Sequence, residues 1–98
     1  MAAHARVAIY SMKQGSAEET AQLAKAGMLP VFQGQPGFVR YELIKLDDGN
    51  LASVSHWETL EEAEAANASA AGWVAENLAA RIELQNTHVG DTLFDEGV

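Results

Sequence analysis

Residues 36–66, PGFVRYELIKLDDGNLASVSHWETLEEAEAA, form the stretch of the chain that decides the fold. Two runs rich in aromatic and aliphatic residues, 38–46 and 51–57, flank the sequence DDGN. An Asp-Gly pair between two such runs predicts a β-hairpin, because glycine adopts a positive φ without steric cost. Thr59, with Glu62 three residues later, predicts the start of a helix, because each side chain can bond a free backbone N–H there. The stretch therefore predicts a strand, a turn, a second strand and a helix in succession.

The segments on either side repeat these element types. Before the hairpin, residues 6–13 (RVAIYSMK) read as a strand, and the SAEE motif that begins at Ser16 predicts another helix start. Pro30 predicts a kink or a new turn inside that helix, because proline lacks an N–H and crowds the preceding turn. After the hairpin, the Ala-rich helix should run to about Ala80, and residues 82–89 (IELQNTHV) predict the last strand.

The predicted order, β-α-β-β-α-β, is the split βαβ pattern of ferredoxin-like α+β folds. In that pattern a four-stranded antiparallel sheet carries both helices on one face. A length of 98 residues suits one domain, because two halves of this size could not each bury a sufficient core. We therefore expect a single domain over residues 1–98, with a core over about 6–93 and an acidic tail over 91–98.

The composition excludes several classes of function. Fourteen Asp and Glu residues against six Lys and Arg give a net charge of −8, which argues against a nucleic-acid partner, since phosphates are bound by Lys and Arg. The chain contains no cysteine, so disulfides, thiolate metal sites and cysteine nucleophiles are excluded. No apolar run is long enough for a signal peptide or a membrane span. We expect a cytoplasmic protein with no membrane partner.

The predicted sheet has apolar side chains on both of its faces. In the strand that opens the hairpin, both phases of the alternation carry them: Phe38, Ile44 and Leu46 in one, and Val39, Tyr41 and Leu43 in the other. A sheet with one face in water should alternate more cleanly than this. The simplest cover for the second face is another copy of the same chain, packed across a two-fold axis. The sequence thus predicts a homodimer.

The hairpin segment also resembles a known family. The run PGFVRYEL, the hairpin and then SHWETLEEAEAA are similar to the antibiotic biosynthesis monooxygenase family of dimeric α/β barrels, over about residues 6–93. The positions that carry the resemblance are Pro36, Gly37, Phe38, Trp57, Thr59, Glu61 and Glu62. The resemblance implies oxygenation of a quinol, a phenol or a polyketide-like aromatic by O2, with no cofactor. Many members have a histidine where this chain has Ala66, and the asparagine that haem-degrading members carry in the first strand has no counterpart here.

Such chemistry would need a dry pocket, a proton acceptor and hydrogen-bond donors for the developing oxyanion. Asn67 is a candidate because it interrupts the inward stripe of the second predicted helix, which consists of Leu60, Ala63, Asn67, Ala70, Val74 and Leu78. Alternatively, the amide bonds a neighbouring group or lies near solvent. Trp73 has small neighbours, which would suit either a ligand beside the indole or close helix packing.

His88 and Asn86 continue the phase of Ile82 and Leu84, so the same strand face turns from apolar to polar. A histidine there could accept a proton at neutral pH, and we predict His88 as the proton acceptor, with Asn67 and Trp73 as the other catalytic candidates. Alternatively, this end of the strand emerges into water or meets the partner chain.

Tyr10, Arg40 and His56 complete the candidate substrate-binding set with Asn86. Tyr10 could donate to an oxyanion and Arg40 could hold an anionic substrate, although such residues are more often ordinary dimer or surface residues. His56 and Trp57 are expected to be structural, and His4 to lie in a frayed terminus. The acidic cluster around Glu61 predicts helix capping and a solvated face, with no metal-binding arrangement.

The leading prediction is a cofactor-independent monooxygenase that acts on a small aromatic substrate. The first alternative is a non-catalytic dimeric barrel protein that binds a small ligand or a partner protein. The second is an isomerase or a decarboxylase that uses the same cleft, because one fold can support several chemistries.

Overall fold

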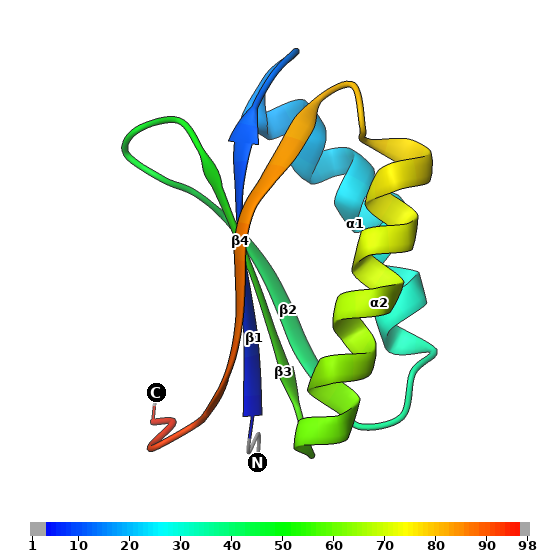
Figure 1. Cartoon of the computed structure of the whole chain (residues 1–98), viewed down its shortest axis with the longest axis vertical. Helices are drawn as coiled ribbons and strands as arrows, with labels where there is room; N and C mark the ends of the chain where they lie inside the picture. The colour runs from blue at the N-terminus through cyan, green and yellow to red at the C-terminus, as the bar shows by residue number, and fades with distance from the viewer. Residues whose placement is uncertain (1–3, 97–98) are drawn as a thin grey trace.

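The computed structural model, which describes residues 4–96, has the predicted order of strands and helices (Figure 1). The elements are β1 (His4–Met12), α1 (Ala17–Gln33), β2 (Phe38–Lys45), β3 (Leu51–Trp57), α2 (Leu60–Asn77) and β4 (Ile82–Asp91). The four strands form one antiparallel sheet in the order β2-β3-β1-β4, and both helices cover the same face of it. The expected ferredoxin-like fold is therefore confirmed.

Local bonding explains the hairpin and the helix starts. Gly49 has a φ of +88° in the turn, and the Leu46 N–H donates to the Asn50 carbonyl at 2.8 Å. At α1, the Glu19 N–H donates to Ser16 Oγ at 3.1 Å and the reciprocal bond to the Glu19 carboxylate is also made. These contacts lie between near neighbours in the chain, which is why the sequence pattern alone predicted them.

The helices differ from expectation in three details. α1 continues through Pro30 as a single element, so of the kink or new turn predicted at the proline, the new turn is not formed. α2 ends at Asn77, three residues earlier than expected, where Leu78 turns inward and becomes almost fully buried. Leu60 was expected on the inward stripe of α2 but is 42% exposed, since the buried stripe of this helix consists of Ala63, Ala66 and Ala70.

One extra residue in each of two strands changes which side chains face the helices. The pairing of β2 with β3 shifts between Phe38 and Arg40, and that of β4 with β1 shifts between Leu84 and Asn86. An extra residue of this kind reverses the alternation beyond it. Phe38 therefore lies on the same face as Tyr41 instead of the opposite face.

The core between the sheet and the helices combines a cluster of aromatic side chains with the small side chains of α2. Phe32 on α1 packs edge-on against Tyr41 and Trp57, with ring centroids 5.1 and 5.3 Å away. Trp57 is fully buried, so its expected place in the core is confirmed. The alanines of α2 lie against this cluster and let the helix approach the sheet closely.

The start of β1 lies beside the end of β4. His4 belongs to β1, pairs with both Trp57 and Asp91, and places its imidazole 3.0 Å from the Asp91 carboxylate, so the expectation of a frayed His4 is wrong. Asp91, the first residue of the expected acidic tail, is the last of β4; residues 92–96 form neither helix nor strand, and 97–98 lie outside the described residues.

Between residues 4 and 96, neither helix is both long and apolar enough to cross a bilayer.

Candidate active site

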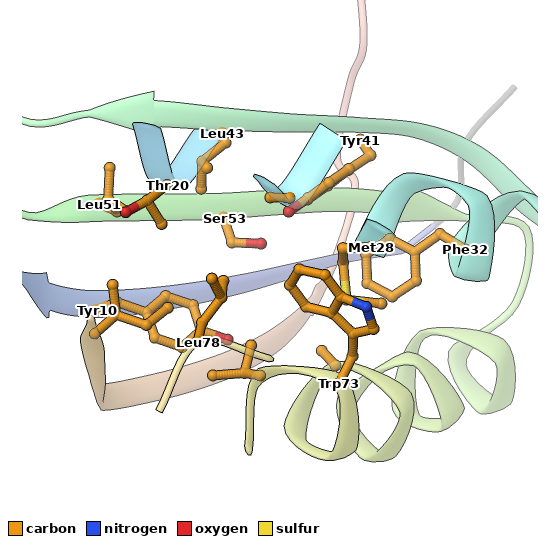
Figure 2. Close-up of a pocket in the computed structure, with 14 residues that line it drawn as sticks. Tyr10, Thr20, Met28, Phe32, Tyr41, Leu43, Leu51, Ser53, Trp73 and Leu78 are labelled. Atoms are coloured by element: carbon orange, nitrogen blue, oxygen red, sulfur yellow. The ribbon is translucent and has the colours of Figure 1, made fainter. Parts of the chain in front are cut away.

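Two hollows lie between the sheet and the helices, and the buried side chain of Tyr10 lines both of them. The first, which we call the inner cavity, is enclosed by α1, α2 and the strands (Figure 2). The second, which we call the cleft, opens between α2 and the β1–β4 side of the sheet. Tyr10 was predicted as a substrate-binding residue, and it stands where a ligand in either hollow would touch its ring.

The inner cavity is apolar with a few polar groups. Hydroxyls of Thr20, Tyr41 and Ser53 line it among leucine, methionine, alanine and aromatic side chains (Figure 2). Its volume is only about 20 Å³. That volume suits one molecule of about the size of water and excludes an aromatic ring in this arrangement of side chains.

Burial determines the state of the Tyr41 hydroxyl. It raises the pKa of the phenol above its ordinary value, and the opposing effects of the Ser53 hydroxyl and the Arg6 charge are smaller. The phenol therefore keeps its proton at neutral pH and remains a hydrogen-bond donor.

Trp73 closes the inner cavity between the helices (Figure 2). Its indole lies against Gly27 of α1, where a Cβ atom would overlap the ring. Glycine at this position lets the indole enter the interface between α1 and α2 and contact both halves of the core. Trp73 therefore makes the close helix packing that was one of its two interpretations from the sequence, and a ligand beside the indole stays a prediction.

The cleft contains a polar contact that joins β1 to α2. Arg6 and Asn67 line it with Tyr10, Ala71, Leu84 and Thr87. The cleft has a volume of about 270 Å³, which admits a small organic ligand. Arg6 as a whole residue is 2% exposed, and its Nε donates a hydrogen bond to Asn67 Oδ1.

The structure does not bring the three predicted catalytic residues together. Asn67 lines the cleft and Trp73 the inner cavity, whereas His88 pairs with Val7 on the opposite face of the sheet. The prediction that His88 shares the face of Ile82 is wrong, because the extra residue in β4 reverses the alternation between them. Asn86 moves to the open face for the same reason, since it pairs with Ile9.

The other predicted substrate-binding residues also lie on the open face. His56 pairs with Ala5 and with Arg40, and the Arg40 side chain is exposed there. His56 and His88 line one shallow hollow on this face, together with Leu93 and Phe94 of the C-terminal segment. Within one chain, these side chains cannot reach a ligand in the cleft or in the inner cavity.

A comparison with protein families identifies the fold independently of this geometry. The family model described as antibiotic biosynthesis monooxygenase matches residues 3–72, which is more than two thirds of the chain. The chain belongs to the antibiotic biosynthesis monooxygenase family. No curated protein matches this family member in sequence.

Solved structures similar to this monooxygenase-family chain have the same fold at low sequence identity. SnoaB, a cofactor-independent oxygenase from Streptomyces nogalater, is 18% identical with a TM-score of 0.71, and 97% of each chain is covered. The ActVA-Orf6 monooxygenase of Streptomyces coelicolor, in complex with nanaomycin D, is 16% identical with a TM-score of 0.66, over 99% of this chain and 91% of that one. A variant of MhuD with two manganese protoporphyrin IX molecules bound per active site is 19% identical with a TM-score of 0.70, over 97% and 99%.

Arg6 lines the cleft of this family member, but the sequence analysis did not identify it as a candidate site residue. In the predicted first strand it appeared as a terminal polar residue before Val7 and Ile9, and nothing local distinguishes it from a solvated one. Its inward phase, shared with Ala8 and Tyr10, becomes evident only when the alternation is compared with the buried side of the sheet. Among residues 4–96, no three His, Asp or Glu side chains gather in a metal-binding arrangement.

Proposed function

We propose that the chain is a cofactor-independent monooxygenase that oxygenates a quinol, a phenol or a polyketide-like aromatic with O2. The observation that carries the proposal is the cleft, where Asn67, Arg6 and Tyr10 present polar groups beside an apolar wall in a member of this family. For a ring CH2 next to a phenol, the reaction consumes one O2, converts the CH2 to a C=O and releases one water.

In this proposal the cleft binds the aromatic ring and stabilises the charge that develops on the substrate oxygen. The Asn67 amide and the Tyr10 hydroxyl are within the lining and can donate hydrogen bonds to that oxygen. The buried Arg6 side chain orients the amide through its bond to Oδ1, which leaves the Asn67 NH2 group free to donate. Trp73 contributes the wall of the adjoining inner cavity.

The substrate proton needs an acceptor that the described lining does not supply. None of the residues that line the cleft or the inner cavity is Asp, Glu or His. His88, predicted as the acceptor, could act only if a second copy brought its open face to the cleft of the first. We therefore favour a substrate acidic enough to ionise in water before or during binding.

The test is oxygen uptake measured with an electrode on a panel of quinols and hydroxyanthrones. Oxygen uptake above the uncatalysed rate, abolished or reduced at least about tenfold by Asn67→Ala and unchanged by Asn77→Ala, is the expected result. Asn77 provides a matched control because it lies on the same helix with its side chain exposed. Uptake that is equal in both variants would exclude a catalytic role for Asn67.

The missing proton acceptor favours one alternative, a dimeric barrel protein that binds a small ligand without converting it. An isomerase or a decarboxylase in the same cleft is less well supported, because proton transfer in those reactions also requires a positioned acid or base. Ligand binding without oxygen uptake across the panel would select the non-catalytic alternative.

We further propose that two copies pair through the open face of the sheet. Both helices lie on the other side (Figure 1), and the open face carries Val7 and Ile9 of β1, Val54 of β3 and the 41%-exposed Ile44 of β2. The C-terminal segment adds Leu93 and Phe94 to the same face, 92% and 82% exposed. A second copy would remove this apolar surface from water.

A further inference from the structure

Arg6 is a buried cation without a matching anion. It lies in the middle of the sheet, paired with Ser55 on one side and Val89 on the other, and its side chain points toward α2. Among residues 4–96, no carboxylate oxygen lies within 4 Å of its guanidinium. Asn67 Oδ1 accepts from Nε, but Nη1 is buried and has no hydrogen-bond partner in the described chain.

An arrangement of this kind is unfavourable for the protein alone. Guanidinium groups stay charged at every pH at which proteins fold, so Arg6 cannot become neutral as a buried lysine can. Buried charges are normally paired, and a single amide oxygen is a weak substitute for a carboxylate. The chain carries 14 acidic residues and yet places none of them beside this arginine. The charge and the unpartnered Nη1 group therefore indicate an anion from outside the described chain.

The cleft has the shape and lining to supply that anion. Ala71 and Leu84 provide apolar walls, while the polar groups of Arg6, Asn67 and Thr87 lie in the same lining. Planar guanidinium groups bind carboxylates through two parallel hydrogen bonds, a geometry that an ammonium group cannot reproduce. None of the lining residues is acidic, so nothing within the lining competes for the arginine.

We propose that Arg6 is the counter-ion for a carboxylate carried by an aromatic ligand that binds in this cleft. The inference rests on the proposed function in one respect only, namely that the cleft binds an aromatic molecule. It adds that the ligand is an aromatic acid, with its ring between the apolar walls and its carboxylate on the guanidinium of Arg6. Arg6 then determines which aromatic molecules bind.

The first experiment compares two probes that differ in charge, 2-naphthoate and 2-naphthamide, by isothermal titration calorimetry at pH 7 without oxygen. The wild-type chain should bind the carboxylate at least about tenfold more tightly than the neutral amide of the same shape. Equal affinity for the two probes, or no binding of the carboxylate, would overturn the proposal. This comparison needs no variant and therefore does not depend on how a substitution affects folding.

Variants then assign the selectivity to Arg6. Arg6→Gln should weaken 2-naphthoate binding at least about tenfold and leave 2-naphthamide within about twofold, whereas Arg6→Lys should retain an intermediate preference for the carboxylate. Lys25→Gln removes the same charge from the exposed surface of α1 and should leave both affinities within about twofold. A loss of preference in Lys25→Gln as large as in Arg6→Gln would show a general charge effect and overturn the proposal.

The outcome is independent of the proposed oxygenation. Naphthoate has no oxidisable phenol, so its binding tests the anion site and not the reaction. If oxygen uptake fails for every quinol while Arg6-dependent naphthoate binding is observed, the anion site stands and the monooxygenase proposal falls. If oxygen is consumed but the two naphthyl probes bind equally, the reverse conclusion follows.

Discussion

At the scale of single residues, the bond between Arg6 and Asn67 joins the sheet to α2 inside the core. Asn67 provides the only side-chain acceptor that the described chain gives to the guanidinium. The amide therefore has a structural role as well as any role toward a ligand, and the two roles can be separated by measuring stability in the absence of ligand.

We predict that Asn67→Ala lowers the free energy of unfolding by about 1–3 kcal/mol, because it leaves a buried charged donor without its partner. The measurement is urea unfolding followed by circular dichroism. Asn77→Ala, on the same helix, removes only an exposed 2.9 Å bond to the Trp73 carbonyl and should change stability by less than about 0.5 kcal/mol. Equal effects of the two substitutions would show that the Arg6 contact contributes nothing.

The raised pKa of Tyr41 leads us to predict a loss of stability at alkaline pH. Burial raises the pKa of its phenol above 10, whereas in the unfolded chain the pKa stays near 10. Above that pH the unfolded chain releases the proton first, so stability is complete below pH 10 and falls as the pH rises through the raised native value. Thermal unfolding between pH 8 and 11 should show a steeper fall for the wild type than for Tyr41→Phe. Parallel curves would refute the prediction.

At the scale of elements, the crossing of α1 and α2 depends on Gly27. Its Trp73 contact leaves no room for a methyl group, so Gly27→Ala should cost about 1–3 kcal/mol of stability despite the higher helix propensity of alanine. Gly72 of α2 has open space around the same position, and Gly72→Ala should raise stability by up to about 1 kcal/mol. The two melting temperatures should therefore move in opposite directions, and a rise in both would contradict the packing described here.

The elements also show what the sequence could and could not predict. The hairpin and both helix starts depend on residues within four positions of each other, so their order was predicted correctly. The extra residues in β2 and β4 depend on how strands far apart in the chain are paired, and no local pattern marks them. Asn67 was expected on the inward side of α2, and it lines the cleft. His88 was expected on the sheet face that carries Ile82, but the extra residue in β4 places it on the open face.

At the scale of the whole molecule, the sheet has one covered and one open face. We predict a mass of about 21 kDa by light scattering at micromolar concentration, twice the 10.5 kDa of one chain. Val7→Lys places a charge in the centre of the open face and should give a monomer. Ala65→Lys adds the same charge to an exposed site on α2 and should remain a dimer. A monomeric wild type would exclude the pairing.

The narrow, mostly apolar inner cavity should also take up small gas molecules. Small apolar gases leave water for dry apolar cavities, and such cavities in proteins take up xenon. The inner cavity is too narrow for an aromatic ring and shares the Tyr10 side chain with the cleft, so we expect its mostly apolar space to take up dioxygen. Under xenon pressure, NMR shifts should concentrate on Met28, Leu51 and Leu78 around the inner cavity. Shifts confined to the open face would mean that the inner cavity does not take up gas.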